Sequence, residues 1–260
     1  MSTRPRRRFG QHFLHDPAII ERIVDWIAPR PGQSLLEIGP GPGALTGRVL
    51  ARAGRLAVIE IDRDLAAALR ERWPGPSGLS VHEGDALRFR LEALGAPLPL
   101  RVFGNLPYNV STPLLFHLLA QHRQITDLHF MLQDEVVRRL AAAPGGKDYG
   151  RLSVMAQYGC RVEAGFSVAP GAFVPPPKVL SRMVRLVPYT TPPVAAEDPA
   201  QFERVVRLLF SQRRKQIGRA LRGILDAAQI RHAGLDPQTR PERLTVAEFV
   251  ALSDAAGPAR

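Results

Sequence analysis

A glycine-rich loop near the start of the sequence has the spacing of an adenosine-cofactor site. The short apolar run over 34–38 leads into Gly39 and Gly41, which with Ala44 match the pattern G-x-G-x-x-[G/A]. Glu60 follows Gly39 by 21 positions and ends the next apolar run, where a carboxylate can accept hydrogen bonds from both hydroxyls of a ribose. The pattern predicts a nucleotide-type cofactor but does not separate nicotinamide dinucleotides from other adenosine cofactors.

Two further acidic residues bear on the identity of the cofactor. Glu37 lies two positions before Gly39, where its charge would repel an anionic pyrophosphate and attract a cationic sulfonium and its amino group. Asp85 follows a third apolar run and is placed either to accept a hydrogen bond from the amino group of an adenine or to close a turn. These acids favour S-adenosylmethionine over a dinucleotide.

The tetrapeptide Asn105-Leu106-Pro107-Tyr108 predicts the reaction. The exocyclic amine of adenine is a poor nucleophile because its lone pair is delocalised into the ring. The side-chain carbonyl of Asn105 and the backbone carbonyl of Leu106 can each accept a hydrogen bond from this amine, which turns its lone pair toward a methyl donor. Pro107 stiffens the turn, and Tyr108 offers a ring on which the base can stack. Positioning and electrostatics suffice for such a transfer, so we predict no metal.

The elements that must position these residues alternate between strands and helices, which indicates an α/β fold with a mostly parallel sheet. We predict strands over 34–38, 56–60, 79–82, 101–103 and 127–132, and helices over 17–27, 44–53, 65–72, 134–142 and 152–159. Two half-exposed strands over 161–168 and 181–187, separated by the proline-rich stretch 173–177, predict an antiparallel edge of the sheet.

The sequence predicts two domains. Residues 1–188 contain every motif above and form the expected methyltransferase domain. Four prolines within 188–199 indicate a linker over 189–199. The remaining stretch, 200–260, has helical patterns only, including a capping box that begins at Thr245, and we predict a small all-helical domain that binds RNA.

Composition and charge limit the functional classes. The 260 residues are 45% hydrophobic and 23% charged, as in folded globular proteins. A single cysteine and the lack of a long apolar stretch predict a cytoplasmic protein that binds no membrane. The 35 basic and 24 acidic residues leave a net charge of +11, which favours a polyanionic partner. We predict RNA contacts in two basic clusters, Arg6, Arg7 and Arg8, and Arg213, Arg214, Lys215 and Arg219.

Eight segments together show a resemblance to the bacterial small-subunit ribosomal RNA adenine dimethyltransferases: 9–14, 37–41, 60–62, 84–86, 105–108, 149–153, 173–179 and 210–215. The resemblance implies the Rossmann-like sheet of class I methyltransferases and S-adenosylmethionine as the cofactor. It implies as substrate two adjacent adenosines in a hairpin loop near the 3′ end of 16S ribosomal RNA, in the 30S subunit or its precursor. Each would become N6,N6-dimethyladenosine, and we expect a monomer that acts in small-subunit biogenesis.

The resemblance also assigns individual positions. His12 departs from the family pattern, which usually has asparagine there, so a contact between its side chain and the cofactor stays open. Phe173 would stack on the target base from the side opposite Tyr108. The family's cofactor contacts fall on His12, Leu14, Gly39, Glu60, Asp85 and Asn105.

Three other interpretations share parts of this pattern. A nicotinamide-dependent oxidoreductase would use the same glycine loop but leaves 105–108 without a task. A ribosome assembly factor would use the basic surfaces without catalysis. A methyltransferase of the macrolide-resistance type, which acts on 23S ribosomal RNA, is disfavoured by the segments 149–153 and 210–215, which follow the small-subunit group.

Overall fold

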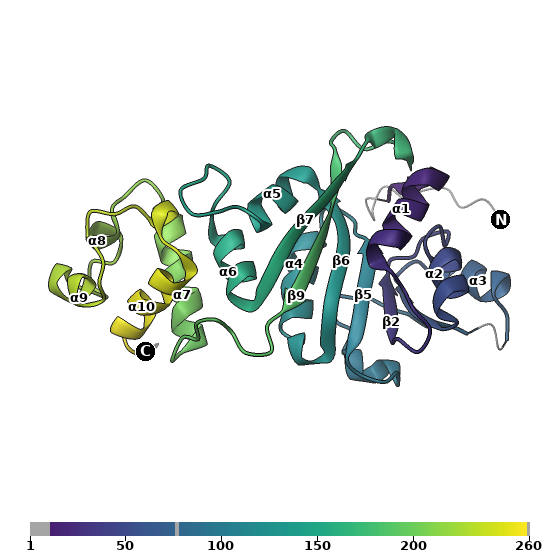
Figure 1. Ribbon diagram of the computed structural model, residues 1–260, viewed down its shortest axis with the longest axis horizontal. Coiled ribbons are helices and arrows are strands. Elements are labelled where there is room, and N and C mark those ends of the chain that lie inside the picture. Colours follow the sequence, from purple (N-terminus) through teal and green to yellow (C-terminus); the bar gives the residue numbers. More distant parts are fainter. Residues whose placement is uncertain (1–10, 76–77, 259–260) are drawn as a thin grey trace. The chain divides into compact units, whose positions relative to one another are not determined.

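The computed structural model describes residues 11–75 and 78–258 (Figure 1). The chain divides into two compact units. The first consists of Met1–Val137 and Glu163–Pro188, and the second of Arg138–Val162 and Tyr189–Arg260. None of the described helices is long and apolar enough to cross a bilayer.

A seven-stranded sheet forms the centre of the first unit, with the strand order β4-β3-β2-β5-β6-β9-β7. Strands β2 to β6 pair in parallel, and β9 runs antiparallel to β6. The order of the strands reverses between β2 and β5, which places a ligand crevice outside the carboxyl ends of these strands. The predicted parallel sheet with an antiparallel edge is confirmed. The strands are β2 (Leu35–Ile38), β3 (Leu56–Glu60), β4 (Leu79–Glu83), β5 (Leu100–Asn105), β6 (Ile125–Gln133), β7 (Cys160–Val168) and β9 (Ser181–Pro188).

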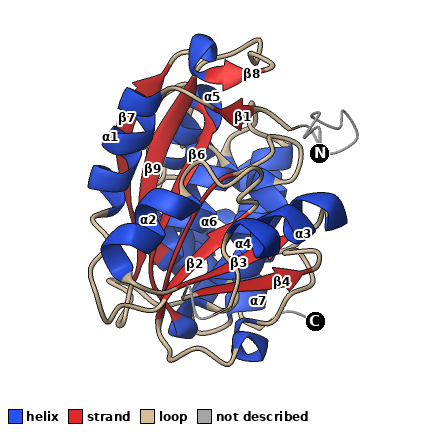
Figure 2. Ribbon diagram, turned by 90° about the vertical axis from the view of Figure 1, so that its right-hand side faces the viewer, coloured by secondary structure: helices blue, strands red, loops and turns tan. Residues whose placement is uncertain are grey.

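Helices cover both faces of this sheet (Figure 2). On one face, α1 (Pro17–Ile27), α2 (Thr46–Ala53) and α3 (Arg63–Arg72) bury apolar side chains in a shared cluster with residues of β2, β3 and β5. Asp16 caps α1, because its carboxylate accepts hydrogen bonds from the backbone amides of Ala18 and Ile19. The opposite face is covered by α4 (Ser111–Leu119), which the sequence did not predict because its apolar residues lack a clear helical period.

A small second sheet was also not predicted. It consists of β1 (Phe13–Leu14) and β8 (Phe173–Val174), which pair antiparallel with Leu14 opposite Phe173. A backbone hydrogen bond of 3.0 Å from the amide of His15 to the carbonyl of Ala172 extends the pairing. Residues 13–15 are thereby paired with 172–174, and Figure 2 shows β1 beside β8.

The second unit is mostly helical and has its own apolar core. Its helices are α6 (Arg151–Gly159), α7 (Pro199–Ser211), α8 (Ile217–Ala220), α9 (Ala227–His232) and α10 (Val246–Ala255), while α5 (Asp134–Leu140) begins in the first unit and ends in the second. The capping box predicted at Thr245 is confirmed, because the Thr245 hydroxyl accepts from the Glu248 amide and the Glu248 carboxylate accepts from the Thr245 amide.

The boundary of this unit corrects the predicted domain division. Residues 138–162 belong to the second unit, whereas the sequence assigned them to the first domain. The physical reason is packing, since Tyr149 and Val154 are fully buried among side chains of α7 and α10. The predicted linker is also packed against this core, where the backbone amide of Ala196 donates to the Tyr158 hydroxyl at 3.1 Å. The break after Pro188 lies where the sequence placed it.

Candidate active site

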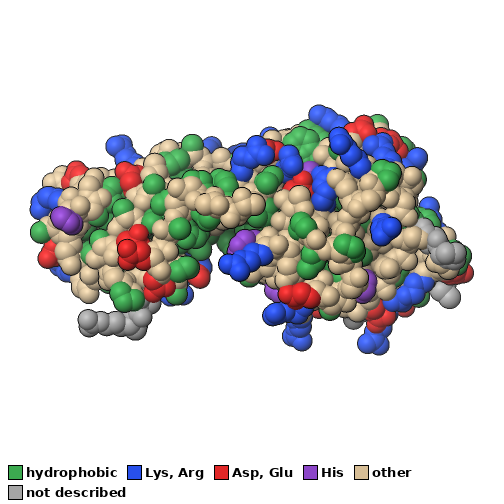
Figure 3. Space-filling model, turned by 60° about the horizontal axis from the view of Figure 1, so that its bottom comes forward, with side chains coloured by type: hydrophobic (Ala, Val, Ile, Leu, Met, Phe, Trp, Pro, Cys, Tyr) green, Lys and Arg blue, Asp and Glu red, His purple; other side chains and the backbone are tan. Residues whose placement is uncertain are grey.

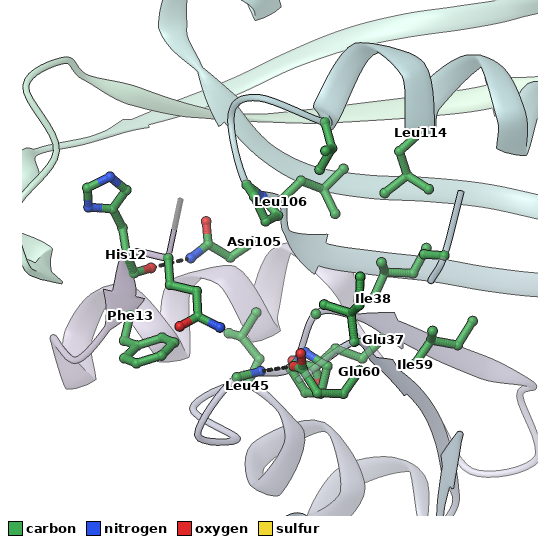
Figure 4. A pocket seen from close by; sticks show the side chains of 18 of the residues that line it. His12, Phe13, Glu37, Ile38, Leu45, Ile59, Glu60, Asn105, Leu106 and Leu114 are labelled. Carbon is green, nitrogen blue, oxygen red and sulfur yellow. Dashed lines mark hydrogen bonds between the residues drawn. The ribbon is translucent and has the colours of Figure 1, made fainter. Parts of the chain in front are cut away.

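A cavity of about 250 Å³ opens at the carboxyl ends of β2, β3, β4 and β5 (Figure 4). It lies within the first unit, at the predicted crevice of the sheet. The structure brings to its wall nine of the residues predicted to bind cofactor or substrate: His12, Leu14, Gly39, Glu60, Asp85, Asn105, Leu106, Pro107 and Tyr108.

The glycine-rich loop holds the Glu60 carboxylate in place. Gly39 and Gly41 have φ angles of +65° and +58°, in the left-handed region that favours glycine. The turn directs the Gly41 amide to Glu60 Oε2 at 3.1 Å, and the Asp62 amide reaches Oε1 at 2.9 Å. Burial raises the pKa of Glu60. The backbone amide of Ile61 also donates to this carboxylate. Because a carboxylate has about four acceptor sites, these bonds leave capacity for a hydroxyl of a ribose.

Glu37 is buried at the end of β2 beneath the same loop. Its side chain is 2% exposed, and the Thr46 hydroxyl donates to Oε2 at 2.6 Å. Burial, opposed by this hydrogen bond and reinforced by the charge of Glu60, raises the pKa of Glu37 to about 8. A carboxyl with this pKa is mostly protonated at neutral pH.

Asp85 closes a turn and also lies at the wall of the cavity. Its Oδ1 accepts from the backbone amide of Leu87 at 2.9 Å, which is a turn contact. The residue also lines the cavity. The turn thus fixes a carboxylate at the wall of the cavity without using all of its acceptor sites.

The Asn105 side chain is oriented by the N-terminal segment. Its amide nitrogen donates to the backbone carbonyl of His12 at 2.9 Å, as the dashed line in Figure 4 shows. The Oδ1 atom accepts no hydrogen bond from the residues that the structure describes. Because the nitrogen already donates to His12, the oxygen is the atom that can accept a hydrogen bond from a ligand in the cavity. The predicted chemistry requires such an acceptor.

The Tyr108 ring is held at its edge and on one face. Its hydroxyl lies 2.8 Å from Ser181 Oγ, and the two groups share a hydrogen bond. The imidazole of His12 stacks on the ring, with centroids 5.6 Å apart and planes inclined by 29°. His12 Nδ1 donates to the Pro175 carbonyl at 2.7 Å. The side chain of His12 therefore contacts Tyr108 and the proline-rich stretch.

The structure does not place Phe173 at the cavity, and its stacking on the target base stays a prediction. Its ring is 2% exposed and belongs to the core cluster under α1 and α2, and it does not line the cavity. The physical reason is the unpredicted pairing of β8 with β1, which places Phe173 opposite the buried Leu14. The aromatic ring stacked on Tyr108 is that of His12.

The basic residues predicted to bind RNA fall in two places. Arg6, Arg7 and Arg8 lie outside the described residues. Arg213, Arg214, Lys215 and Arg219 are exposed, the first three in the turn between α7 and α8 and the last in α8 of the second unit. Arg213 also donates to the backbone carbonyl of Lys147 at 3.0 Å, so it supports the loop before α6 as well.

A buried ionic cluster at the other end of the sheet is structural. Asp127 accepts from Arg101 at 2.9 Å and lies 3.1 Å from the ring of His129. Burial alone would raise the pKa of Asp127, but these hydrogen bonds lower it well below its usual range. Arg101 also donates to the carbonyl of Ile27 at 2.7 Å, which ties α1 to the sheet. Among the described residues, no group of three or more His, Cys, Asp or Glu side chains is arranged to hold a metal.

Three residues of the site were missed by the sequence analysis. Ile61 is 46% exposed at the cavity wall, and an exposed apolar residue directly after Glu60 is a signal that could have been used. Thr46, at the start of α2, contacts Glu37. Ser181 gave no signal, because it lies 73 positions from Tyr108 and only the folded chain brings the two together.

The strand order, the glycine loop with its acid, and Asn105 to Tyr108 at the end of β5 define a class I methyltransferase. The chain matches the family model for ribosomal RNA adenine dimethylase over residues 2–256. It is 55% identical over 252 residues to "Ribosomal RNA small subunit methyltransferase A" of Pseudomonas aeruginosa, covering 96% of this chain and 94% of that protein. The corresponding protein of Vibrio cholerae is 54% identical over 255 residues, covering 98% and 94%. The chain therefore belongs to the ribosomal RNA adenine dimethylase family.

Solved structures agree with this assignment. A dimethyladenosine transferase from Plasmodium falciparum superimposes with a TM-score of 0.81 at 25% identity, covering 93% of this chain and 96% of that one. The 23S rRNA methyltransferase ErmE gives a TM-score of 0.71 at 28% identity, covering 94% and 98%. The predicted family, fold class and enzymatic class are confirmed, and the oxidoreductase alternative is wrong.

Proposed function

We propose that this enzyme transfers methyl groups from S-adenosylmethionine to the N6 amines of two adjacent adenosines in the hairpin loop near the 3′ end of 16S ribosomal RNA. The observation that carries the proposal is the side chain of Asn105, whose nitrogen is committed to His12 and whose oxygen is left to accept from an amine. The named function of the relatives, which are 53–55% identical to this chain, supports the small subunit as substrate. We place the reaction in the 30S subunit or its precursor, in the cytoplasm, and the enzyme as a monomer.

The residues present fit a cationic adenosine cofactor. Two buried carboxylates, Glu37 and Glu60, line one cavity, and Asp85 lies at its wall. Burial raises the pKa of Glu37 against the hydrogen bond from Thr46, and a ligand cation would supply the positive partner that favours its ionised form. Glu60 would take the ribose hydroxyls and Asp85 the adenine amino group. When bound, S-adenosylmethionine supplies an electrophilic methyl group on a sulfonium.

The remaining work of the site is to make the target amine a nucleophile and to hold it still. Asn105 Oδ1 and the Leu106 carbonyl would each accept one N6 hydrogen, which concentrates the lone pair on the nitrogen. Tyr108 would bind the flipped base by stacking on its ring. Because both acceptors are adjacent residues at the carboxyl end of β5, one backbone segment would hold them together against the amine.

The second unit supplies the basic side chains that we assign to RNA phosphates. Arg213, Arg214, Lys215 and Arg219 are exposed and lie within one short stretch of the chain. Basic side chains also lie at several separate places on each unit, on the face drawn in Figure 3. We therefore assign these four residues, together with Arg6, Arg7 and Arg8, to positioning of the RNA and not to chemistry.

The decisive experiment is incubation of undermethylated 30S particles with labelled S-adenosylmethionine, followed by mapping of the modified bases. We expect two adjacent N6,N6-dimethyladenosines near the 3′ end of 16S ribosomal RNA. Label found only in 23S ribosomal RNA, with 50S particles offered in parallel, would show the macrolide-resistance type of activity. An inactive variant that still restored maturation of the small subunit would show that assembly is the main role.

A further inference from the structure

Ser181 holds the Tyr108 ring from a fixed point of the sheet. It is fully buried at the start of β9, where it pairs with Gln133 at the end of β6. The preceding carbonyl, that of Leu180, accepts from the Asp134 amide at 2.9 Å. The Ser181 hydroxyl therefore has little freedom, and it lies 2.8 Å from the hydroxyl of Tyr108.

The Tyr108 ring depends on this contact, because it stands on a loop at the cavity wall. The ring is only partly buried, and its other described support is the His12 imidazole on one face. A buried phenol hydroxyl needs a hydrogen-bond partner, and a single bond at the tip of the ring restricts rotation of the side chain. Without it the ring would sample other rotamers and the stacking surface would be lost for part of the time.

We propose that Ser181 is a positioning residue for the methyl transfer, whose hydroxyl fixes the Tyr108 ring in the orientation on which the target adenine stacks. The inference rests on the proposed function, since it needs an adenine bound on Tyr108. Ser181 touches neither substrate nor cofactor and acts through Tyr108 alone. An adenine held within reach of the methyl donor reacts faster in proportion to the time that it spends correctly oriented.

The test is a double-mutant cycle on labelled 30S particles with wild type, Ser181→Ala, Tyr108→Phe and the double variant. Each single variant breaks the same hydrogen bond and should lower kcat by about tenfold. The double variant should lie within about twofold of either single variant, whereas independent effects would multiply to about a hundredfold. The affinity for S-adenosylmethionine, measured by calorimetry, should not change, since neither hydroxyl contacts Glu37, Glu60 or Asp85, the residues assigned to the cofactor.

Ser253→Ala is the matched control, because Ser253 is an equally buried serine in α10 of the second unit. It should keep wild-type kcat. Ser181→Ala at wild-type kcat, or a double variant that multiplies the single effects, would overturn the inference. A wild-type enzyme that methylates no 30S particle would instead contradict the proposed function, so the two failures are distinguishable.

Discussion

The two halves of the active-site cavity are built in different ways. The cofactor half contains the glycine loop and Glu60. It comes from the β2-α2-β3 stretch, in which Gly41 donates to Glu60 only 19 positions along the chain. The adenine half, which we assign to the target adenine of the RNA, contains Asn105 and Tyr108. It comes from three distant segments, since Tyr108 contacts His12 and Ser181, which are 96 and 73 positions away. Local turns can be recognised from residue spacing, whereas contacts between distant segments depend on the finished fold.

This difference has a functional meaning. The cofactor half is preformed by backbone amides, and its acceptors stay in place as long as the sheet is intact. The adenine half relies on side chains that support one another, with His12 linked both to Asn105 and to Pro175. Substitutions in the cofactor half should therefore change binding, and substitutions in the adenine half should change turnover.

The largest effect is expected for Asn105→Ala. The variant removes an acceptor that matters mainly in the transition state, so kcat should fall by about a hundredfold or more. Cofactor affinity should stay within a few-fold of wild type, because Glu60 and Asp85 are unchanged. Single-turnover assays and calorimetry measure the two quantities. A kcat within about threefold of wild type would remove Asn105 from the mechanism.

The second prediction compares two aromatic residues to which the sequence gave the same role. Tyr108→Leu should lower kcat/KM by about fivefold to a hundredfold through lost base stacking, with little change in stability. Phe173→Leu should do the reverse, because its ring is in the core, and should lower the free energy of unfolding by about 1–2 kcal/mol. Denaturant unfolding measures the change in stability. Assays in which activity is divided by the amount of enzyme that binds cofactor measure the change in kcat/KM. If Phe173→Leu impaired turnover as Tyr108→Leu does, the ring would belong to the adenine site after all.

These two residues also show how far the sequence could be interpreted. The glycine loop, Glu60 and Asn105 were found because regular strand-loop-helix units place them at one edge of the sheet. The burial of Phe173 was not predicted because the pairing of β1 with β8 depends on two strands of two residues each, too short to give a periodic pattern. The grouping of 138–162 with the C-terminal helices was missed for a related reason, since a helical pattern does not say which element its buried face contacts.

The third prediction concerns Glu60→Gln in the cofactor half. The amide keeps the shape of the side chain but loses charge-assisted hydrogen bonds, so the dissociation constant for S-adenosylmethionine should rise by about tenfold to a hundredfold. At saturating cofactor, kcat should stay within about threefold of wild type. Cofactor titration by calorimetry, paired with turnover at high cofactor concentration, gives both values. An unchanged dissociation constant would contradict the assignment of Glu60 to the ribose.

The smallest effect is a pH dependence that arises from Glu37. Burial raises the pKa of this carboxyl to about 8 in the ligand-free protein, so the group is protonated at neutral pH. A bound cation favours the ionised form and lowers the pKa, and binding then releases a proton. Cofactor affinity should therefore rise with pH, by up to about fivefold between pH 7 and pH 8, and level off above that.

Glu37→Gln is the matched variant, since the Thr46 hydroxyl can donate to the amide oxygen as it does to the carboxylate. The amino group of the cofactor titrates in both proteins, so the difference between the two affinity curves reports Glu37 alone. Stability gives a second measurement with a definite sign. The raised pKa favours the folded state at low pH, and this contribution is lost as the pH rises from about 4.5 to about 8. Over that range the free energy of unfolding of the ligand-free wild type should fall relative to that of Glu37→Gln. If the two free energies changed equally with pH, Glu37 would be ionised at neutral pH without a cofactor.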